Sequence, residues 1–115
     1  MLNEQYKEMV SMLISATKGK KLKWSEIQNG FTTRINGCPI ELLSYYDSSV
    51  GYSGYTLSLS NKNEKQFCSF DKTETIDHED YKELDLLYQT IRDSIFHITE
   101  SEANILDGLK QMLSI

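Results

Sequence analysis

Residues Ser44–Ser60 have the sequence SYYDSSVGYSGYTLSLS, and this stretch decides the architecture in the middle of the chain. In its second half, Tyr55, Leu57 and Leu59 alternate with smaller polar residues. Alternation with a period of two is typical of a strand that buries one face in an antiparallel sheet. Glycines and serines in the first half supply a turn. The stretch therefore predicts a long hairpin.

The same period continues on both sides of this hairpin. Asn29-Gly30 and Asn36-Gly37 are turn signals of the kind that require a positive backbone φ. A meander of four to five antiparallel strands follows from these signals. The predicted strands are Lys21 to Gln28, Gly30 to Ile35, Ile40 to Tyr46, Tyr55 to Ser60 and Gln66 to Phe70.

Helical periodicity flanks the meander. From Asn3 to Lys18 the apolar residues recur every three or four positions, and Gly19 supplies the stop. From Asp77 an apolar stripe extends to Ile98, with Asp77 or Asp80 as the expected N-cap. Thr99-Glu100-Ser101-Glu102 matches a capping box just before Ala103, Leu106, Leu109 and Leu113, which predicts a third helix that starts there.

These elements predict a single α+β domain over residues 1–115. It should contain an N-terminal helix, an antiparallel sheet of four to five meandering strands, and two C-terminal helices packed with it on one face of the sheet. The predicted core consists of Met9, Leu13, Trp24, Phe31, Ile35, Leu42, Leu57, Leu59, Phe70, Leu84, Leu87, Ile91, Ile95 and Leu106.

Composition narrows the class of protein. The chain has 115 residues, of which 39% are hydrophobic and 25% charged, as expected for one ordinary globular domain. A net charge of −5 argues against nonspecific nucleic-acid binding. The first residues lack the basic and apolar blocks of a signal peptide, and no membrane span is expected. Two cysteines are too few for a disulfide-rich secreted scaffold, so we expect a cytoplasmic protein.

Residues with catalytic or metal-binding chemistry are sparse. His78 lies among the acidic residues Asp77, Glu79 and Asp80. Neighbouring residues at the start of a helix point in different directions around its axis, so they do not converge on a metal ion. We expect these residues to stabilise the N-terminus of the helix instead. His97, Cys38 and Cys68 lie in no recognisable catalytic signature. The sequence predicts no metal, no cofactor and no catalytic residue.

Two surfaces are candidates for binding another protein. The first is the tyrosine hairpin, with Tyr45, Tyr52 and Tyr55, because tyrosine, serine and glycine form adaptable contact loops. The alternative is that these rings only cover their own strands. The second is the acidic segment 74–85, with Glu79 and Glu83 as its representative residues.

Two functional hypotheses remain open. In the first, the protein is a small non-catalytic, intracellular protein-binding module of the type found among inhibitors, immunity proteins and phage counter-defence proteins. A homo-oligomer is compatible with it. In the second, the sheet and helices enclose a small ligand or nucleotide, with enzymatic activity. Few polar side chains are expected to converge on one point, which favours the first hypothesis.

The chain also resembles a kind of short α+β protein found in bacteria and their mobile elements. The matching residues are Thr17, Gly19, Lys20, Leu22 and Trp24, then Ile35-Asn36-Gly37, then the late helical sequence LDLLYQTIRDSI. This resemblance implies a compact α+β module, and it assigns no activity and no catalytic residue.

Overall fold

The computed structural model describes residues 4–114 and has the predicted α+β architecture. The elements in chain order are α1 (Glu4–Lys18), β1 (Ser25–Ile27), β2 (Gly30–Ile35), β3 (Cys38–Asp47), β4 (Tyr52–Ser60), β5 (Gln66–Thr73), α2 (His78–Phe96) and α3 (Ile98–Leu113). The N-terminal helix, the antiparallel sheet and the two C-terminal helices are all confirmed.

The five strands form one meander in the order β1-β2-β3-β4-β5, with every neighbouring pair antiparallel. Asn29 and Asn36 both adopt positive φ in the turns where this was expected. β1 is shorter than predicted, while the central hairpin is longer. Its pairing extends out to Asp47 opposite Tyr52, so Tyr52 lies in β4 and not at the tip of the loop.

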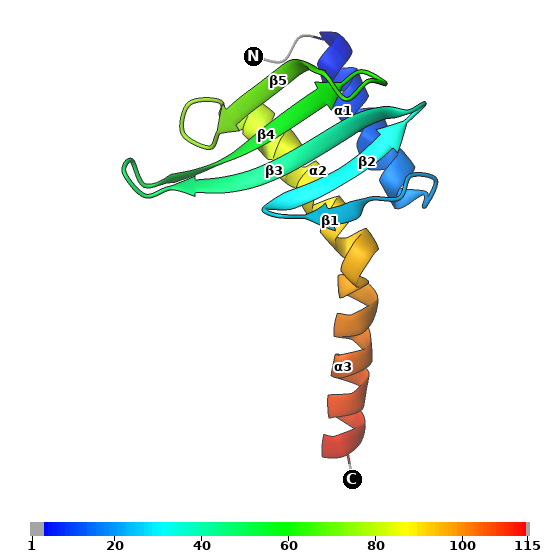
Figure 1. Ribbon diagram of the computed structural model, residues 1–115. Helices are drawn as coiled ribbons and strands as arrows, with labels where there is room; N and C mark the ends of the chain where they lie inside the picture. Colours follow the sequence, from blue (N-terminus) through cyan, green and yellow to red (C-terminus); the bar gives the residue numbers. More distant parts are fainter. Residues whose placement is uncertain (1–3, 115) are drawn as a thin grey trace.

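One face of the sheet is covered by α1 and α2, as Figure 1 shows. The buried core contains Val10, Leu13, Trp24, Phe31, Ile40, Leu42, Tyr55, Leu57, Leu59, Leu84, Leu87 and Ile91, and Met9, Phe70 and Ile95 pack against it. Two core predictions are wrong. Ile35 is 40% exposed because β2 ends there, and Leu106 is 52% exposed because it lies on α3.

The link from α1 into the sheet is fixed by buried hydrogen bonds. The indole Nε1 of Trp24 donates to Thr17 Oγ1 at 3.0 Å, and that hydroxyl donates to the Leu13 carbonyl at 2.7 Å. In β2, the Thr33 hydroxyl donates to the Lys23 carbonyl at 2.7 Å. Because buried polar groups are costly when unpaired, this network holds α1 in one position on the sheet.

The start of α2 differs in detail from the prediction. Asp77 occupies the N-cap position, but its side chain makes no capping hydrogen bond and instead accepts one from the Thr73 amide at 3.3 Å. Asp80 lies within the first turn and is buried, with its carboxylate 3.6 Å from the Lys72 ammonium. This ion pair joins α2 to β5.

The third helix leaves the body of the protein. It begins at Ile98, directly after His97, whose φ of 51° separates it from α2. The predicted capping box is wrong: Thr99 lies inside the helix, and its amide and hydroxyl both donate to Asp93 Oδ1 at 2.7 Å. In Figure 1, α3 extends past β1 and away from the sheet, so of the two C-terminal helices α2 alone packs on the sheet face. No helix within residues 4–114 has the length and apolar character needed to cross a membrane.

Candidate functional site

Tyr55 belongs to the interface between β4 and α2. Its side chain is 6% exposed, and its ring centroid lies 5.2 Å from that of Tyr81 and 5.1 Å from that of Tyr88. The hydroxyl donates to Asp85 Oδ1 at 2.5 Å. Burial first, and then this hydrogen bond, raise the pKa of Tyr55 above its usual value. The ring therefore stabilises the packing of α2 on the sheet.

Tyr45 and Tyr52 lie on the opposite, outer face of the sheet. Tyr45 pairs with Gly54 across the hairpin, and a Cβ placed on Gly54 would come within 2.4 Å of the tyrosine ring. The ring thus covers bare backbone, and its hydroxyl donates to Asp71. Burial and the contact with Asp71 raise the pKa of Tyr45 to about 12. Tyr45 and Tyr52 remain half-buried on a face that no helix covers (Figure 1).

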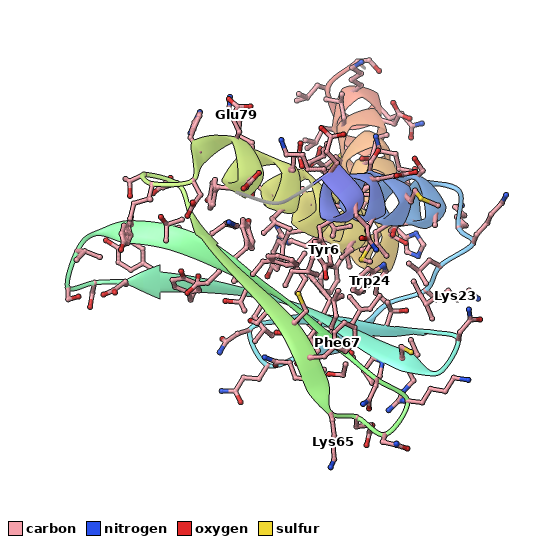
Figure 2. The ribbon with its side chains drawn as sticks, turned by 90° about the horizontal axis from the view of Figure 1, so that it is seen from above. Tyr6, Lys23, Trp24, Lys65, Phe67 and Glu79 are labelled. Carbon is pink, nitrogen blue, oxygen red and sulfur yellow. The ribbon has the colours of Figure 1, made fainter. Side chains whose placement is uncertain are left out.

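Some carboxylates of the acidic segment and of the adjoining strand β5 accept hydrogen bonds from other residues of the chain. Asp71, Glu74 and Asp85 accept hydrogen bonds from Tyr45, the Ser53 amide and Tyr55 respectively. Glu79 is exposed near the start of α2, where Figure 2 labels it, and Glu83 is half-buried one turn later. An exposed carboxylate in the first turn of a helix also complements the helix dipole.

The sequence prediction missed an exposed apolar surface on α3. It consists of the side chains on one side of α3, here called the α3 stripe: Ile105, Leu106, Leu109, Met112 and Leu113, which are 49% to 84% exposed. None of the side chains of α3 is buried. Their spacing of three and four residues was a correct signal for an amphipathic helix. Of these five residues the sequence places Leu106 alone in the predicted core, and this is wrong because periodicity does not say what covers the apolar side.

A second apolar surface lies beside α1. This feature, here called the α1 groove, is open to solvent and has a volume of about 660 Å³. Its walls are α1 with the segment that follows it, the adjoining ends of β2 and β3, and the adjoining ends of β4 and β5, and α2 contributes no side chain to it. In Figure 2, Phe67 is seen near the start of β5, and Lys65 lies in the loop just before that strand. The apolar lining residues are Met9, Met12, Leu13, Ala16, Leu22, Ile35, Pro39, Ile40, Leu59 and Phe67.

A smaller polar cavity of about 380 Å³ lies where α1 ends and α3 begins. Lys18, Lys20, Asp93 and His97 contribute to its wall. The amide and hydroxyl of Thr99 hold the pKa of Asp93 below its usual value, because both donate to the ionised carboxylate. The cavity therefore contains the hydrogen bonds that cap α3.

His78 is exposed at the first position of α2, and Cys38 and Cys68 are free, half-buried thiols. Within residues 4–114, no three His, Cys, Asp or Glu side chains gather in a group that could hold a metal ion. The α3 stripe, the α1 groove and the outer tyrosines, Tyr45 and Tyr52, have the apolar or amphipathic character of a contact surface.

No model of a known protein family matches this chain, and neither the curated protein sequences nor the solved structures contain a significant match to it.

Proposed function

We propose that this protein is a small, non-catalytic protein-binding module and that the α3 stripe is its main contact surface. The observation that carries the proposal is the exposure of the apolar side of an amphipathic helix. Five large apolar side chains of α3 face solvent on one side, while the helix buries none of its residues in its own domain. Contiguous apolar surface of this kind marks a site of association.

The energetics of an isolated helix support the same conclusion. α3 has 16 residues. In water, isolated helices of about 12 to 15 residues or fewer are marginal, and most helical stability in proteins comes from packing an amphipathic face. α3 includes Gly108, which lowers its intrinsic helix propensity by about 1 kcal/mol relative to alanine. A partner on the apolar side would supply the missing packing.

The two surfaces predicted from the sequence become secondary contacts in this proposal. Tyr45 and Tyr52 are accessible on the outer sheet face, and Glu79 and Glu83 are accessible near the start of α2. Tyr55 contributes indirectly, because it fixes α2 against β4. We place the protein in the cytoplasm, in agreement with its two free thiols, and within the broad class of inhibitors, immunity proteins and counter-defence proteins.

A second candidate function is supported by the α1 groove. Its volume of about 660 Å³ lies in the usual range for small-molecule sites of about 300 to 1,000 Å³, and its lining is almost entirely apolar. Such a groove would accept an apolar ligand. It offers few polar side chains to orient one for a reaction, so this alternative is a binding function.

The test of the main proposal compares two doubly truncated proteins. Leu106→Ala with Leu109→Ala removes the centre of the α3 stripe, whereas Asn104→Ala with Gln111→Ala removes two polar side chains from the other side of the same helix. Alanine preserves helix propensity in both. Association with the cellular partner, first identified by cross-linking and then reconstituted from purified proteins, should weaken at least about tenfold for the first variant alone.

Retention of every wild-type association by the leucine variant would contradict the proposal. In that case, loss of binding with Tyr52→Ala would move the contact to the outer tyrosines. Loss with Glu79→Lys and Glu83→Lys, accompanied by a changed salt dependence, would move it to the acidic segment.

A further inference from the structure

We infer that the partner of α3 is a second copy of this chain, and that the α3 stripe of each copy lies in the α1 groove of the other. This inference rests on the proposed function, because it names the partner of the same contact surface. Both surfaces are apolar and open to solvent in the described domain, and they correspond in size, in chemistry and in the order of their charges.

The dimensions of helix and groove agree. α3 has 16 residues and is therefore about 24 Å long. The groove runs beside α1 from Gln5 to Ala16, a distance of about 17 Å along the helix. The apolar stripe from Ile105 to Leu113 covers about 12 Å of α3 and fits within that length.

The side chains on both surfaces suit a helix packed in a groove. The walls offer Met9 and Met12 from α1 and Phe67 from β5, and the stripe contributes leucine, isoleucine and Met112. Methionine adapts its shape to irregular gaps, which helps two surfaces from different copies to interdigitate. Amphipathic helices commonly bind apolar grooves in this manner.

The order of the charges selects one orientation. In the groove wall, Glu8 lies eight residues before Ala16, and the Lys21 amide is bonded to the Ala16 carbonyl, so Glu8 and Lys21 mark opposite ends. On α3, Glu102 precedes Lys110 by eight residues as well. Both spacings correspond to about 12 Å along a helix. An α3 that runs antiparallel to α1 places Glu102 near Lys21 and Lys110 near Glu8.

The groove cannot receive α3 of its own chain. His97 is the single residue between α2 and α3, and one residue spans at most about 3.6 Å. α1 packs on α2, and the groove lies on a side of α1 to which α2 contributes nothing. Because packed helices lie about 8 to 10 Å apart, α3 would have to pass around the end of α1. A second copy has no such constraint.

Pairing of α3 with α3 alone would give a small contact. Sixteen residues are fewer than the three to four heptads, about 21 to 28 residues, over which a coiled coil is recognised. A reciprocal exchange buries two stripes and two grooves, which suits the roughly 1,200 to 2,000 Å² of a stable interface. Reciprocity also gives the closed two-fold symmetry of most homodimers.

The experiment uses the purified full chain and two charge insertions. Met12→Lys alters the groove and Leu109→Lys alters the stripe, and both positions are at least 49% exposed in the single copy. Ser11→Lys and Gln111→Lys are matched controls, because each adds the same charge to an exposed neighbouring site. Molar mass by sedimentation velocity is measured for each protein and for a mixture of the first two, with circular dichroism to verify folding.

The wild type and both controls should be dimers, and each insertion alone should weaken dimerisation about tenfold or more. Mixing the groove variant with the stripe variant should restore dimer mass, because one intact stripe then meets one intact groove. Glu8→Lys should weaken the dimer, and adding Lys110→Glu to the same chain should restore part of the loss.

Three results would overturn the inference. Normal dimerisation of Met12→Lys would show that α3 pairs without the groove. Failure of the mixture to recover dimer mass would exclude the reciprocal arrangement. A wild type that is monomeric up to its solubility limit, but still binds another protein through Leu106 and Leu109, would refute the second copy and leave the proposed function standing.

Discussion

α2 and α3 are amphipathic helices of similar length with opposite surroundings. α2 has 19 residues and fully buries Leu84, Leu87 and Ile91 against the sheet and α1. α3 has 16 residues and buries none, although its apolar side chains follow the same spacing. Figure 1 shows α2 crossing behind the sheet and α3 continuing beyond it.

The difference shows that periodicity determines a helix and its apolar side, while topology determines what covers that side. α2 follows a turn of four residues after β5 and returns directly across the sheet. α3 follows α2 after one residue, when the neighbouring positions on the sheet are already taken by α1 and α2. Its apolar side is therefore left exposed in the described structure.

The largest expected effect concerns the packed helix. Leu87→Ala should lower the free energy of unfolding by about 2 to 5 kcal/mol, because the leucine is completely buried and its removal leaves a cavity. The neighbouring Leu86→Ala is the control, since Leu86 is half exposed. Urea denaturation monitored by circular dichroism measures both. A loss well below about 1 kcal/mol for Leu87→Ala would mean that α2 does not pack as described.

A smaller loss is expected at the anchor of α1. Thr17→Val keeps the shape of the side chain but removes the acceptor for the Trp24 indole, which is buried. An unsatisfied buried donor costs about 1 to 3 kcal/mol. Thr17→Ser retains the hydroxyl and should recover most of this stability in the same denaturation assay. If the Thr17→Val and wild-type proteins are equally stable, the hydrogen bond between Trp24 and Thr17 does not stabilise the position of α1.

The tyrosines predict that the sheet, α1 and α2 lose folding stability at alkaline pH. α3 should not contribute to this loss, because it contains no tyrosine. Folding raises the pKa of Tyr45 from 10.0 to about 12, so the folded state holds more protons than the unfolded state between these values. Stability should therefore be unaffected below about pH 10 and fall as the pH rises above it. Tyr55 acts in the same direction.

Denaturation midpoints across this range measure the slope, and tyrosinate absorbance reports the titration. Tyr45→Phe should reduce the alkaline loss, because it removes one of the tyrosines whose pKa is raised; Tyr6, Tyr55 and Tyr81 are the others. A slope unchanged by Tyr45→Phe and by Tyr55→Phe would assign the alkaline loss to other residues.

The smallest effect is expected on α3. In the monomer, Leu106→Ala should change the free energy of unfolding by less than about 0.5 kcal/mol, since the leucine is half exposed and contacts no core. Dilute protein carrying Leu109→Lys provides the monomeric background. A loss of the size expected for Leu87→Ala would show that α3 folds back onto its own domain.

Much of the fold follows from local patterns in the sequence. Leu57 and Leu59 alternate with serine, and both are buried on the helix-covered face. Asn29, Asn36 and Gly37 adopt the positive φ that Asn-Gly turns favour, at the two hairpin turns that the sequence predicts. Such features depend on neighbours in the sequence, so a single chain is enough to predict them.

The contact surfaces depend on where the sheet ends, which local patterns do not report. Ile35 continues the alternation of β2 but lies where the helices no longer cover the sheet. Leu106 has the spacing of a core residue on a helix that has no place left on the sheet. Both were predicted to be buried, and both lie in the surfaces that we propose to meet between two copies.

Hydrogen exchange in α3 tests the central claim most directly. We compare amide protection in α2 and α3 between concentrated wild-type protein and the Leu109→Lys variant at the same concentration. The amides of α2 should be protected equally in both. Those of α3 should be protected in the wild type and exchange nearly as fast as an unfolded chain in the variant, and the wild-type protection should fade on dilution. Protection of α3 that is equal in both proteins and independent of concentration would contradict docking on a second copy.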